Sequence, residues 1–294
     1  MRVFVTGATG WVGSAVVAEL LEHGHSVAGL CRSDANAAML RAKGVEPVRG
    51  SLADIDVLSD AASDADAVVH TAFGHDFSKF PENSEQDRRV IDAMGRRLIG
   101  TAKPMLVTTG LLMLAPGRVA TEADMPPLTD PKYPRKTEAA VKVLADADVN
   151  IGVVRLAPTV HGLGDRMFMN ILAQKARETG VSAYVDDGEN RWCAVHVSDV
   201  GSVYRLALEA GLPSRVFHAS AEEGVTFKAI AEAIGSNLGL PVVSRPREHF
   251  GWFAAFAEND APTSSADTRE LLQWKPKGPT LLKDLHNPNY FPQL

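Results

Sequence analysis

The sequence predicts an α/β fold in which a doubly wound parallel sheet carries a smaller, mixed C-terminal lobe. From residue 1 to about residue 157, short apolar runs alternate with segments of helical periodicity, as in a parallel sheet covered on both faces. A glycine cluster, GATGWVG at residues 7–13, directly follows the first apolar run. After about residue 157 the alternation loosens. We therefore expect a sheet domain over residues 1–157 and a substrate-binding lobe over residues 158–294, partly interleaved with the sheet.

The individual elements follow from this alternation. Apolar runs such as Ala67–Val69 and Met105–Val107 are short and uninterrupted, as expected for strands buried on both faces. Strands are expected at residues 1–6, 25–31, 45–48, 66–72, 104–109 and 150–156, and helices near residues 11–23, 34–43, 54–62, 84–101, 135–148, 167–179, 199–210 and 226–238. Right-handed crossovers between parallel strands then place a ligand at the carboxyl edge of the sheet.

The glycine cluster lies between the first strand and the first helix. Gly7 permits a sharp turn, and Gly10 lacks a Cβ, so a pyrophosphate can approach the backbone. Gly13 lets the helix pack closely on the strand, and the helix N-terminus offers free N–H groups and a positive dipole end. An ordinary glycine turn is the alternative, but the flanking strand and helix favour a Rossmann-type dinucleotide site.

The end of the second strand indicates which dinucleotide is bound. A site that prefers NAD usually has a carboxylate about 20 residues past the glycines, where it binds the ribose hydroxyls. This chain has Arg32 there, followed by Ser33, and a guanidinium can pair with a 2′-phosphate. The interpretation is NADP, with NAD as the alternative if Arg32 is only a solvated cation and Asp34 binds the ribose or caps the next helix.

The third, fourth and fifth strands contribute further candidate cofactor contacts. Ser51 and Leu52 follow the third strand, where an adenine would lie, whereas Asp54 is expected to cap the next helix. The segment 71–73 ends the fourth strand, and its small residues allow close approach of the cofactor. Thr108 ends the fifth strand and is also expected at the cofactor.

Composition excludes several classes of function. The 294 residues carry a formal net charge of −6 and have no basic stripe, so nucleic acid is not an expected partner. Cys31 and Cys193 do not have metal-ligand spacing, and no metal site is predicted. No apolar run is long enough to span a membrane, and the first strand begins at residue 1 without a signal peptide. The expected location is the cytoplasm.

Several motifs together resemble those of the extended short-chain dehydrogenase/reductases. They are TGATGWVG at the N-terminus, HTAF after the fourth strand, VTTG at the fifth and RLAPTVHGLG after the sixth. The runs GENRWCAVHVSD and HFGW are more similar to an atypical branch, whose members are described as NAD-dependent epimerase/dehydratases or 3β-hydroxysteroid dehydrogenases. The resemblance covers most of the chain and implies an NAD(P)-dependent enzyme acting on a small molecule, and a homodimer.

The resemblance also implies where the cofactor lies. Residues Thr9, Gly10, Trp11 and Val12 would border the pyrophosphate, Thr71, Ala72 and Phe73 the adenosine-side ribose and phosphates, and Pro158, Thr159 and Val160 the nicotinamide.

The catalytic unit of this superfamily is a Tyr, a Lys four residues later on the same helix, and a Ser or Thr at the end of the fifth strand. Here the position four after Tyr133 is Thr137, and Lys136 is three residues after Tyr133. The prediction is Tyr133 as proton donor, Lys136 as its cation and Thr109 as the hydroxyl partner. Alignment on Glu138 instead puts Pro134 and Asp130 in the dyad positions, and then the dyad is absent, while Gly110 is the alternative to Thr109.

Three further residues are predicted at the substrate. His75 follows the fourth strand and is a candidate acid or base. Arg191 would clamp an anionic group, and Trp192 would stack on a ring. His196 is expected to be structural, and Trp252, with Phe253 and Phe256, to be core with a substrate wall as the alternative.

These observations favour an NADP-dependent oxidoreductase that transfers a hydride between the nicotinamide and a carbonyl or secondary alcohol of a small, partly apolar molecule. Two alternatives stay open. One is a dinucleotide-binding sensor without turnover, and the other is an epimerase or dehydratase that retains NAD.

Overall fold

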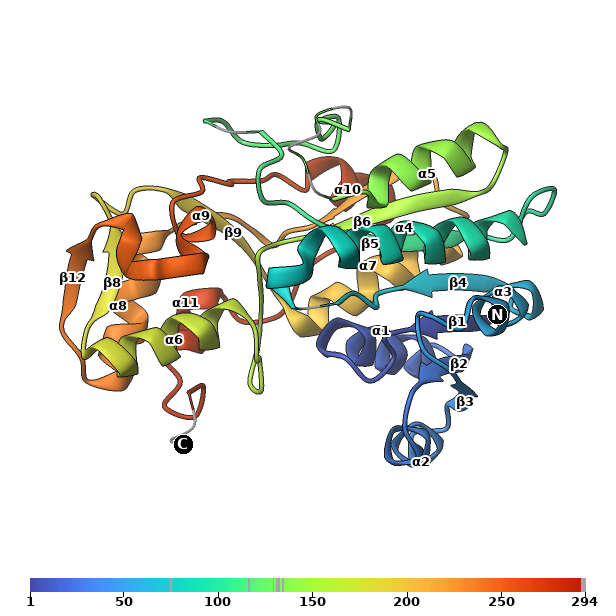
Figure 1. Ribbon diagram of the computed structural model, residues 1–294, viewed down its shortest axis with the longest axis horizontal. Helices are drawn as coiled ribbons and strands as arrows, with labels where there is room; N and C mark the ends of the chain where they lie inside the picture. The colour runs from blue at the N-terminus through green and yellow to red at the C-terminus, as the bar shows by residue number, and fades with distance from the viewer. Residues whose placement is uncertain (75, 116, 129, 131–132, 134, 292–294) are drawn as a thin grey trace.

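The computed structural model describes residues 1–74, 76–115, 117–128, 130, 133 and 135–291 (Figure 1). Within them, parallel strands form a central sheet in the order β10–β6–β5–β4–β1–β2–β3. The chain winds outward from β1 in both directions, so the switch point lies between β1 and β4. The expected doubly wound sheet is confirmed. Its strands are β1 (Arg2–Thr6), β2 (Ser26–Cys31), β3 (Glu46–Arg49), β4 (Ala67–His70), β5 (Met105–Gly110), β6 (Ile151–Leu156) and β10 (Val216–Ala219).

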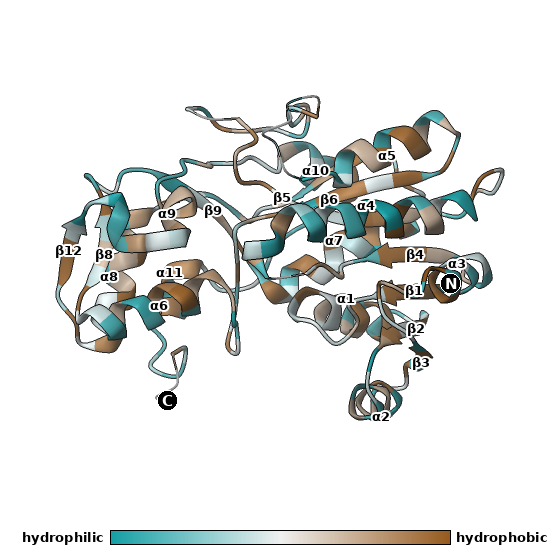
Figure 2. Cartoon of the chain, in the orientation of Figure 1, coloured by the Kyte–Doolittle hydropathy of each residue, from teal (hydrophilic) through white to brown (hydrophobic). Residues whose placement is uncertain are grey.

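Helices cover both faces of this sheet. One face is covered by α1 (Trp11–Glu22), α2 (Asp34–Ala42) and α7 (Val197–Glu209), and the other by α3 (Ile55–Asp64), α4 (Phe80–Arg96) and α5 (Thr137–Asp146). Side chains of β1 alternate between the two cores, with Val3 and Val5 in one and Phe4 in the other. Figure 2 shows β1 and β4 largely in brown, the hydrophobic end of the scale, whereas much of α4 is teal.

The C-terminal lobe is mixed, as expected, and lies at one end of the sheet domain (Figure 1). In its described residues, β9 pairs parallel with β7 and antiparallel with β11, and β8 pairs parallel with β12. Its elements include β7 (Thr159–His161), α6 (Phe168–Thr179), β8 (Ser182–Val185), β9 (Arg191–His196), β11 (Glu222–Thr226), α8 (Phe227–Leu238), β12 (Val242–Arg245), η2 (Arg247–Phe253), α9 (Ala254–Ala257) and α11 (Leu281–Leu285).

The C-terminal half also contributes to the sheet domain. Strand β10 pairs with β6 in parallel, with Val216 opposite Val153. Helix α7 lies against α1 so closely that a Cβ on Gly201 would be 2.7 Å from the carbonyl oxygen of Ala15. Helix α10 (Ala266–Leu272) packs on β10 and α7, so the C-terminal half contributes a strand and two helices to the sheet domain.

Two local expectations were wrong. Helix α4 was expected over residues 84–101 but begins at Phe80, because Pro81 suits the first turn of a helix. Asp54 was expected to cap α3, but its side chain makes no capping bond. Its carboxylate instead accepts hydrogen bonds from the Ser51 N–H at 2.7 Å and the Ser51 hydroxyl at 2.8 Å, which lower the pKa of Asp54.

The cysteines and the search for membrane spans complete the description. Cys31 and Cys193 are both buried and free. Over the residues that the structure describes, no helix is long and apolar enough to cross a bilayer. The same residues contain no group of three His, Cys, Asp or Glu side chains placed to hold a metal ion.

Candidate cofactor and active site

The glycine loop has the geometry that its spacing predicts. Gly7 has a φ of +70°, and the Gly10 N–H donates to the Gly7 carbonyl at 2.8 Å, which closes the turn. A Cβ on Gly13 would lie 2.0 Å from the Gly7 carbonyl oxygen, so only glycine allows the helix to pack here. Helix α1 begins after Gly10 without a side-chain cap. Its first N–H groups and the side-chain-free backbone of Gly10 form a cradle that fits a pyrophosphate.

Trp11 joins the glycine loop to the segment that follows β6. Its indole Nε1–H donates to the Val160 carbonyl at 2.8 Å, and the Thr159 hydroxyl donates to the Cys193 carbonyl at 2.7 Å. Segment 158–160, which is predicted to hold the nicotinamide, is therefore fixed on one side by the loop and on the other by the lobe.

Arg32 and Ser33 lie where the sequence places them, after the end of β2. The Ser33 hydroxyl accepts a hydrogen bond from the Asn36 N–H at 3.2 Å and so caps α2. Arg32 is exposed and, among the described residues, has no hydrogen bond or ion pair. Asp34 instead pairs with Arg49 at 3.3 Å. A guanidinium without a partner among the described residues is thus available directly after β2, where the sequence predicts the 2′-phosphate.

The ends of β4 and β1 are joined by hydroxyl groups. The Thr71 hydroxyl donates to the Thr6 carbonyl at 2.8 Å, and the Ala72 N–H donates to the Thr6 hydroxyl at 3.4 Å. A Cβ on Gly7 would lie 2.7 Å from the Thr71 hydroxyl oxygen, so segment 71–73 borders the glycine loop directly. Both segments lie at the switch point between β1 and β4.

The two threonines at the end of β5 have different surroundings. The Thr108 hydroxyl donates to the His70 carbonyl at 2.7 Å and lies 2.7 Å from the hydroxyl of the fully buried Tyr204. Thr109 is buried, and its hydroxyl has no hydrogen bond with the described residues. Thr109 is therefore the one whose hydroxyl remains available to a ligand.

Tyr133 and Lys136 both precede α5, so they do not share a helix face. Tyr133 is half-buried, and its hydroxyl bonds to no residue that the structure describes. Burial raises the pKa of Tyr133, and the nearby carboxylate of Glu138 raises it further. Lys136 is exposed, and its ammonium pairs with Glu85 of α4 at 2.9 Å. Their roles stay predictions.

Arg135, next to Lys136 in the chain, is the cation that lies at the sheet edge. Its Nη2 donates to the Thr108 carbonyl at 3.0 Å and its Nε to the Thr137 hydroxyl at 2.8 Å. The guanidinium carbon lies 3.9 Å from the centre of the Phe73 ring, a cation–π contact. Burial lowers the pKa of Arg135.

A buried polar chain that the sequence did not reveal lies behind Arg135. The Thr137 hydroxyl donates to one Asp87 oxygen at 2.5 Å, and His70 Nε2 lies 3.0 Å from the other. His70 Nδ1 in turn lies 2.6 Å from the Thr6 hydroxyl. Thr6, His70, Asp87 and Thr137 are at most 2% exposed and come from four different elements. No local spacing connects them, so only the fold brings them together.

Glu138 has a structural partner. Its carboxylate accepts two hydrogen bonds from Arg155 of β6, at 2.9 and 2.7 Å, and both side chains are buried. Such a paired charge orders the start of α5 against the sheet. Pro134, which the alternative alignment would put in the lysine position, lies outside the described residues.

The predicted substrate residues have varied environments. Arg191 donates to both oxygens of Asp260, at 3.1 and 2.9 Å, so its charge is matched within the protein. Trp192 is fully buried in the lobe core, where its ring cannot stack on a substrate, which corrects that expectation. His196 caps α7 by accepting a hydrogen bond from the Ser198 N–H at 3.2 Å. His75 lies outside the described residues.

Aromatic rings extend from the sheet edge toward the lobe. Phe80 lies 5.5 Å from Phe73 and 6.4 Å from Phe77 of the short helix η1 (Phe77–Lys79), measured between ring centres. Phe77 stacks on Trp252 at 5.4 Å, and Trp252 is 58% exposed. This aromatic wall, formed by Phe73, Phe77, Phe80 and Trp252, runs from Arg135 to the surface.

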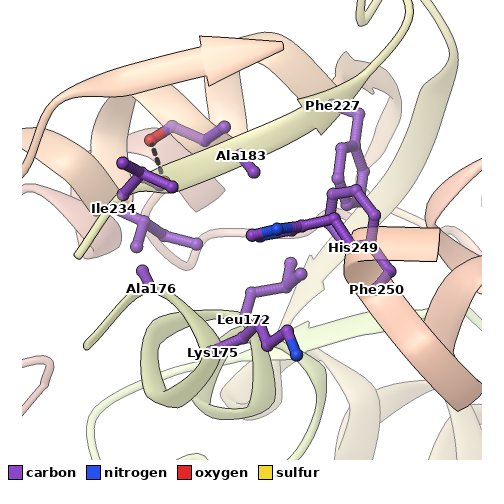
Figure 3. Close-up of a pocket in the computed structure, with 11 residues that line it drawn as sticks. Leu172, Lys175, Ala176, Ala183, Phe227, Ile234, His249 and Phe250 are labelled. Carbon is purple, nitrogen blue, oxygen red and sulfur yellow. Dashed lines mark hydrogen bonds between the residues drawn. The ribbon is translucent and has the colours of Figure 1, made fainter. Parts of the chain in front are cut away.

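A separate, small pocket lies within the lobe (Figure 3). Its volume is about 10 Å³, and Leu172, Lys175, Phe227 and His249 are among its lining residues. His249 Nε2 is buried and has no partner among the described residues, and burial lowers the pKa of this histidine. The space fits about one water molecule, so it is no substrate site.

Comparison with known proteins gives a consistent picture. A family model described as NAD(P)H-binding matches residues 7–159. An uncharacterized protein of Schizosaccharomyces pombe is 44% identical over 99% of this chain and 100% of its own length. A 2-alkyl-3-oxoalkanoate reductase of Stenotrophomonas maltophilia is 29% identical over 83% of this chain and 78% of its own. A solved UDP-glucose-4-epimerase with bound NAD has a TM-score of 0.76 and 20% identity, and the match covers 99% of this chain and 97% of that one, which shows a shared fold.

Proposed function

Because the chain belongs to the NAD(P)H-binding family within the short-chain dehydrogenase/reductases, we propose that it is an NADP-dependent oxidoreductase. Its substrate is a small, partly apolar molecule with a carbonyl or secondary alcohol. The observation that carries the proposal is the glycine cradle at the start of α1, with the unpaired Arg32 at the end of the neighbouring strand. The similar 2-alkyl-3-oxoalkanoate reductase supports a carbonyl substrate.

In this proposal, segments at the carboxyl ends of the strands each contact a different part of the cofactor. The backbone of residues 7–13 and the N-terminus of α1 hold the pyrophosphate, Arg32 and Ser33 hold the 2′-phosphate, Ser51 and Leu52 border the adenine, and segments 71–73 and 158–160 enclose the rest of the cofactor. When bound, the reduced nicotinamide supplies a hydride to a carbonyl carbon. The protein must then position that carbonyl and deliver a proton to its oxygen.

Tyr133 delivers that proton, and the Thr109 hydroxyl donates a hydrogen bond to the same oxygen. Both hydroxyls are without partners among the described residues. Burial raises the pKa of Tyr133, which keeps the phenol protonated at neutral pH, the form that a donor needs. Positive charge from Arg135 opposes this shift and stabilises the phenolate left after transfer.

The aromatic wall favours the interpretation that the substrate is partly apolar. Trp252 is mostly exposed although it stacks on Phe77, so the wall presents ring surface at the outer end of the path to Arg135. We place the apolar part of the substrate against it.

A non-catalytic role is the second candidate, and one observation favours it. Lys136, three residues after Tyr133, pairs with Glu85 at 2.9 Å on the protein surface, so this lysine does not complete the usual Tyr–Lys arrangement. A protein of this kind would bind the dinucleotide and report its level without consuming a substrate.

A turnover assay distinguishes the proposed oxidoreductase from a non-catalytic dinucleotide-binding protein. Purified protein with NADPH is tested against a panel of apolar ketones and keto acids, and NADPH consumption is followed by absorbance. Ketone-dependent oxidation of NADPH is expected. Tight NADPH binding without oxidation by any member of the panel would contradict catalysis and favour the sensor. Release of NAD from the denatured, freshly purified protein would favour the epimerase or dehydratase instead.

A further inference from the structure

No carboxylate among the described residues forms a direct ion pair with Arg135. Its Nε and Nη2 donate to a hydroxyl and a carbonyl, and its third nitrogen, Nη1, bonds to none of the described residues. The carboxylates whose charge acts on it are Asp87, reached through the Thr137 hydroxyl, and Glu138, which is itself paired with Arg155. Arg191, by contrast, contacts both oxygens of Asp260 directly. A largely buried guanidinium in this position favours an anionic partner.

The surroundings of Arg135 fix its orientation. The Thr108 carbonyl and the Thr137 hydroxyl hold two of its nitrogens, and the Phe73 ring lies against its face at 3.9 Å. Asp87 is itself fixed by His70 on the side away from Thr137. The guanidinium is therefore preorganised, so little side-chain freedom remains to be lost when an anion binds.

The position of Arg135 in the sheet indicates which anion it meets. The glycine cradle that fits the pyrophosphate follows β1, whereas Arg135 lies at the carboxyl end of β5, beyond β4. Tyr133, the proposed proton donor, lies two residues away in the chain. An anion at Arg135 is therefore next to the reacting carbonyl, and a planar carboxylate matches the fork of a guanidinium.

We propose that Arg135, held by Thr108, Thr137 and Phe73, binds a carboxylate of the substrate beside the reacting carbonyl, so that the preferred substrates are apolar keto acids. This inference rests on the proposed oxidoreductase function and narrows its substrate class. It also transfers to Arg135 the anion-binding role that the sequence suggested for Arg191.

The first experiment tests binding without turnover. Calorimetric titration of the NADP-loaded wild-type protein compares octanoate with octanamide, which differ in charge and have the same chain. Octanoate is expected to bind about tenfold to a hundredfold more tightly, the range for loss of one charge-assisted contact. Equal affinity, or no binding of octanoate, would overturn the proposal.

Variants test whether Arg135 is the residue that binds octanoate. Arg135→Gln is expected to remove the preference for octanoate, and Arg135→Lys, which keeps the charge but not the fork, to reduce it. The control is Arg96→Gln, an exposed arginine at the end of α4, which should behave as wild type. Thermal unfolding shows whether Arg135→Gln is folded; if it is not, the Arg135→Lys result and the wild-type comparison decide. An unchanged preference in a folded Arg135→Gln protein contradicts the assignment.

Two further measurements distinguish the possible causes of a negative result. NADP affinity should be similar in wild type and Arg135→Gln; a large loss would mean that the anion is a cofactor phosphate. Turnover of 3-oxooctanoate is compared with turnover of 2-heptanone, the matching ketone without the carboxylate. If both are reduced equally well, the oxidoreductase function stands and the carboxylate site is wrong. If neither is reduced although octanoate binds at Arg135, the carboxylate site stands and the proposed reaction is wrong.

Discussion

Arg135 and Lys136 are adjacent cations with opposite surroundings. Arg135 is largely buried at the sheet edge, whereas Lys136 reaches across the surface to Glu85. Lys136 could share a helix face with Tyr133 only if the helix began at or before residue 133. Because α5 begins at Thr137, the side chains before it follow the path of the loop and not the periodicity of a helix.

Arg32 should decide cofactor preference. Arg32→Ala is expected to weaken NADP binding about tenfold to a hundredfold, because one charge-assisted contact to the 2′-phosphate is lost, and to leave NAD affinity nearly unchanged. Calorimetric titration with both dinucleotides measures this. Arg41→Ala, an exposed arginine in the last turn of α2, is the matched control. Equal losses for the two cofactors would refute the phosphate contact.

Tyr133 should be needed for turnover but not for folding. Tyr133→Phe removes only a hydroxyl that bonds to none of the described residues, so thermal stability should be retained. We expect kcat to fall at least about a hundredfold, the scale of a lost general acid. Steady-state kinetics with NADPH and a reducible ketone measure it, with Tyr184→Phe in β8 as control. A fall of less than about threefold would show that another group supplies the proton.

At the scale of elements, two glycines of the loop between β1 and α1 should affect different properties: Gly10 mainly cofactor binding, and Gly13 mainly stability. Gly10 has an extended backbone, with φ −80° and ψ 175°, which any residue can adopt. A Cβ there would lie 3.1 Å from the Gly7 carbonyl oxygen, so Gly10→Val should cost some stability but still fold, and NADP affinity should be strongly reduced because the side chain occupies the pyrophosphate position. Calorimetry and thermal unfolding measure the two effects, and unchanged NADP affinity would contradict the assignment of this loop.

Substitution of Gly13, three residues later, should instead reduce the stability of the fold. A Cβ there would lie 2.0 Å from a backbone oxygen, so α1 must move away from the loop. We expect Gly13→Ala to destabilise the protein by about 1–3 kcal/mol, as for an overpacked core. Denaturant unfolding checks this, and an unchanged midpoint would show that α1 can shift without cost.

The sequence predicted those elements whose signals are local. The strands β1 to β6 and the helix α1 begin and end within a few residues of their expected positions, because each has its own apolar run or glycine stop. No strand after β6 was predicted, β10 included, because the alternation of apolar runs with helical segments loosens after about residue 157. The glycine loop was predictable for the same reason, whereas the chain from Thr6 to Thr137 depends on contacts between distant elements.

At the scale of the whole molecule, Asp165 connects the lobe to the C-terminal segment. Its carboxylate accepts hydrogen bonds from the Met167 N–H at 2.6 Å and the Tyr290 hydroxyl at 3.3 Å. Burial raises the pKa of Asp165 from 3.8 to about 6. The neutral form is therefore favoured in the folded protein, and its stabilising contribution is complete below about pH 4 and lost as the pH rises through 6.

Asp165→Asn should remove this pH dependence. The amide keeps the acceptor for the Met167 N–H but carries no charge, so the variant should gain stability relative to wild type at pH 7 and not at pH 4. Thermal unfolding at both pH values checks the prediction. A difference between the two proteins that is the same at both pH values would contradict the proposed titration.

Strand β10 has a consequence for synthesis of the chain. The edge of β6 acquires its neighbour only when residues 216–219 have left the ribosome, more than sixty residues after β6 itself. Until then the nascent sheet exposes an unpaired row of N–H and C=O groups on an apolar strand, which invites pairing with other chains. A chain interrupted anywhere between β6 and β10 would carry the complete glycine cradle and still be prone to aggregate. Strand β10 therefore covers the open edge of the sheet that the first 156 residues form.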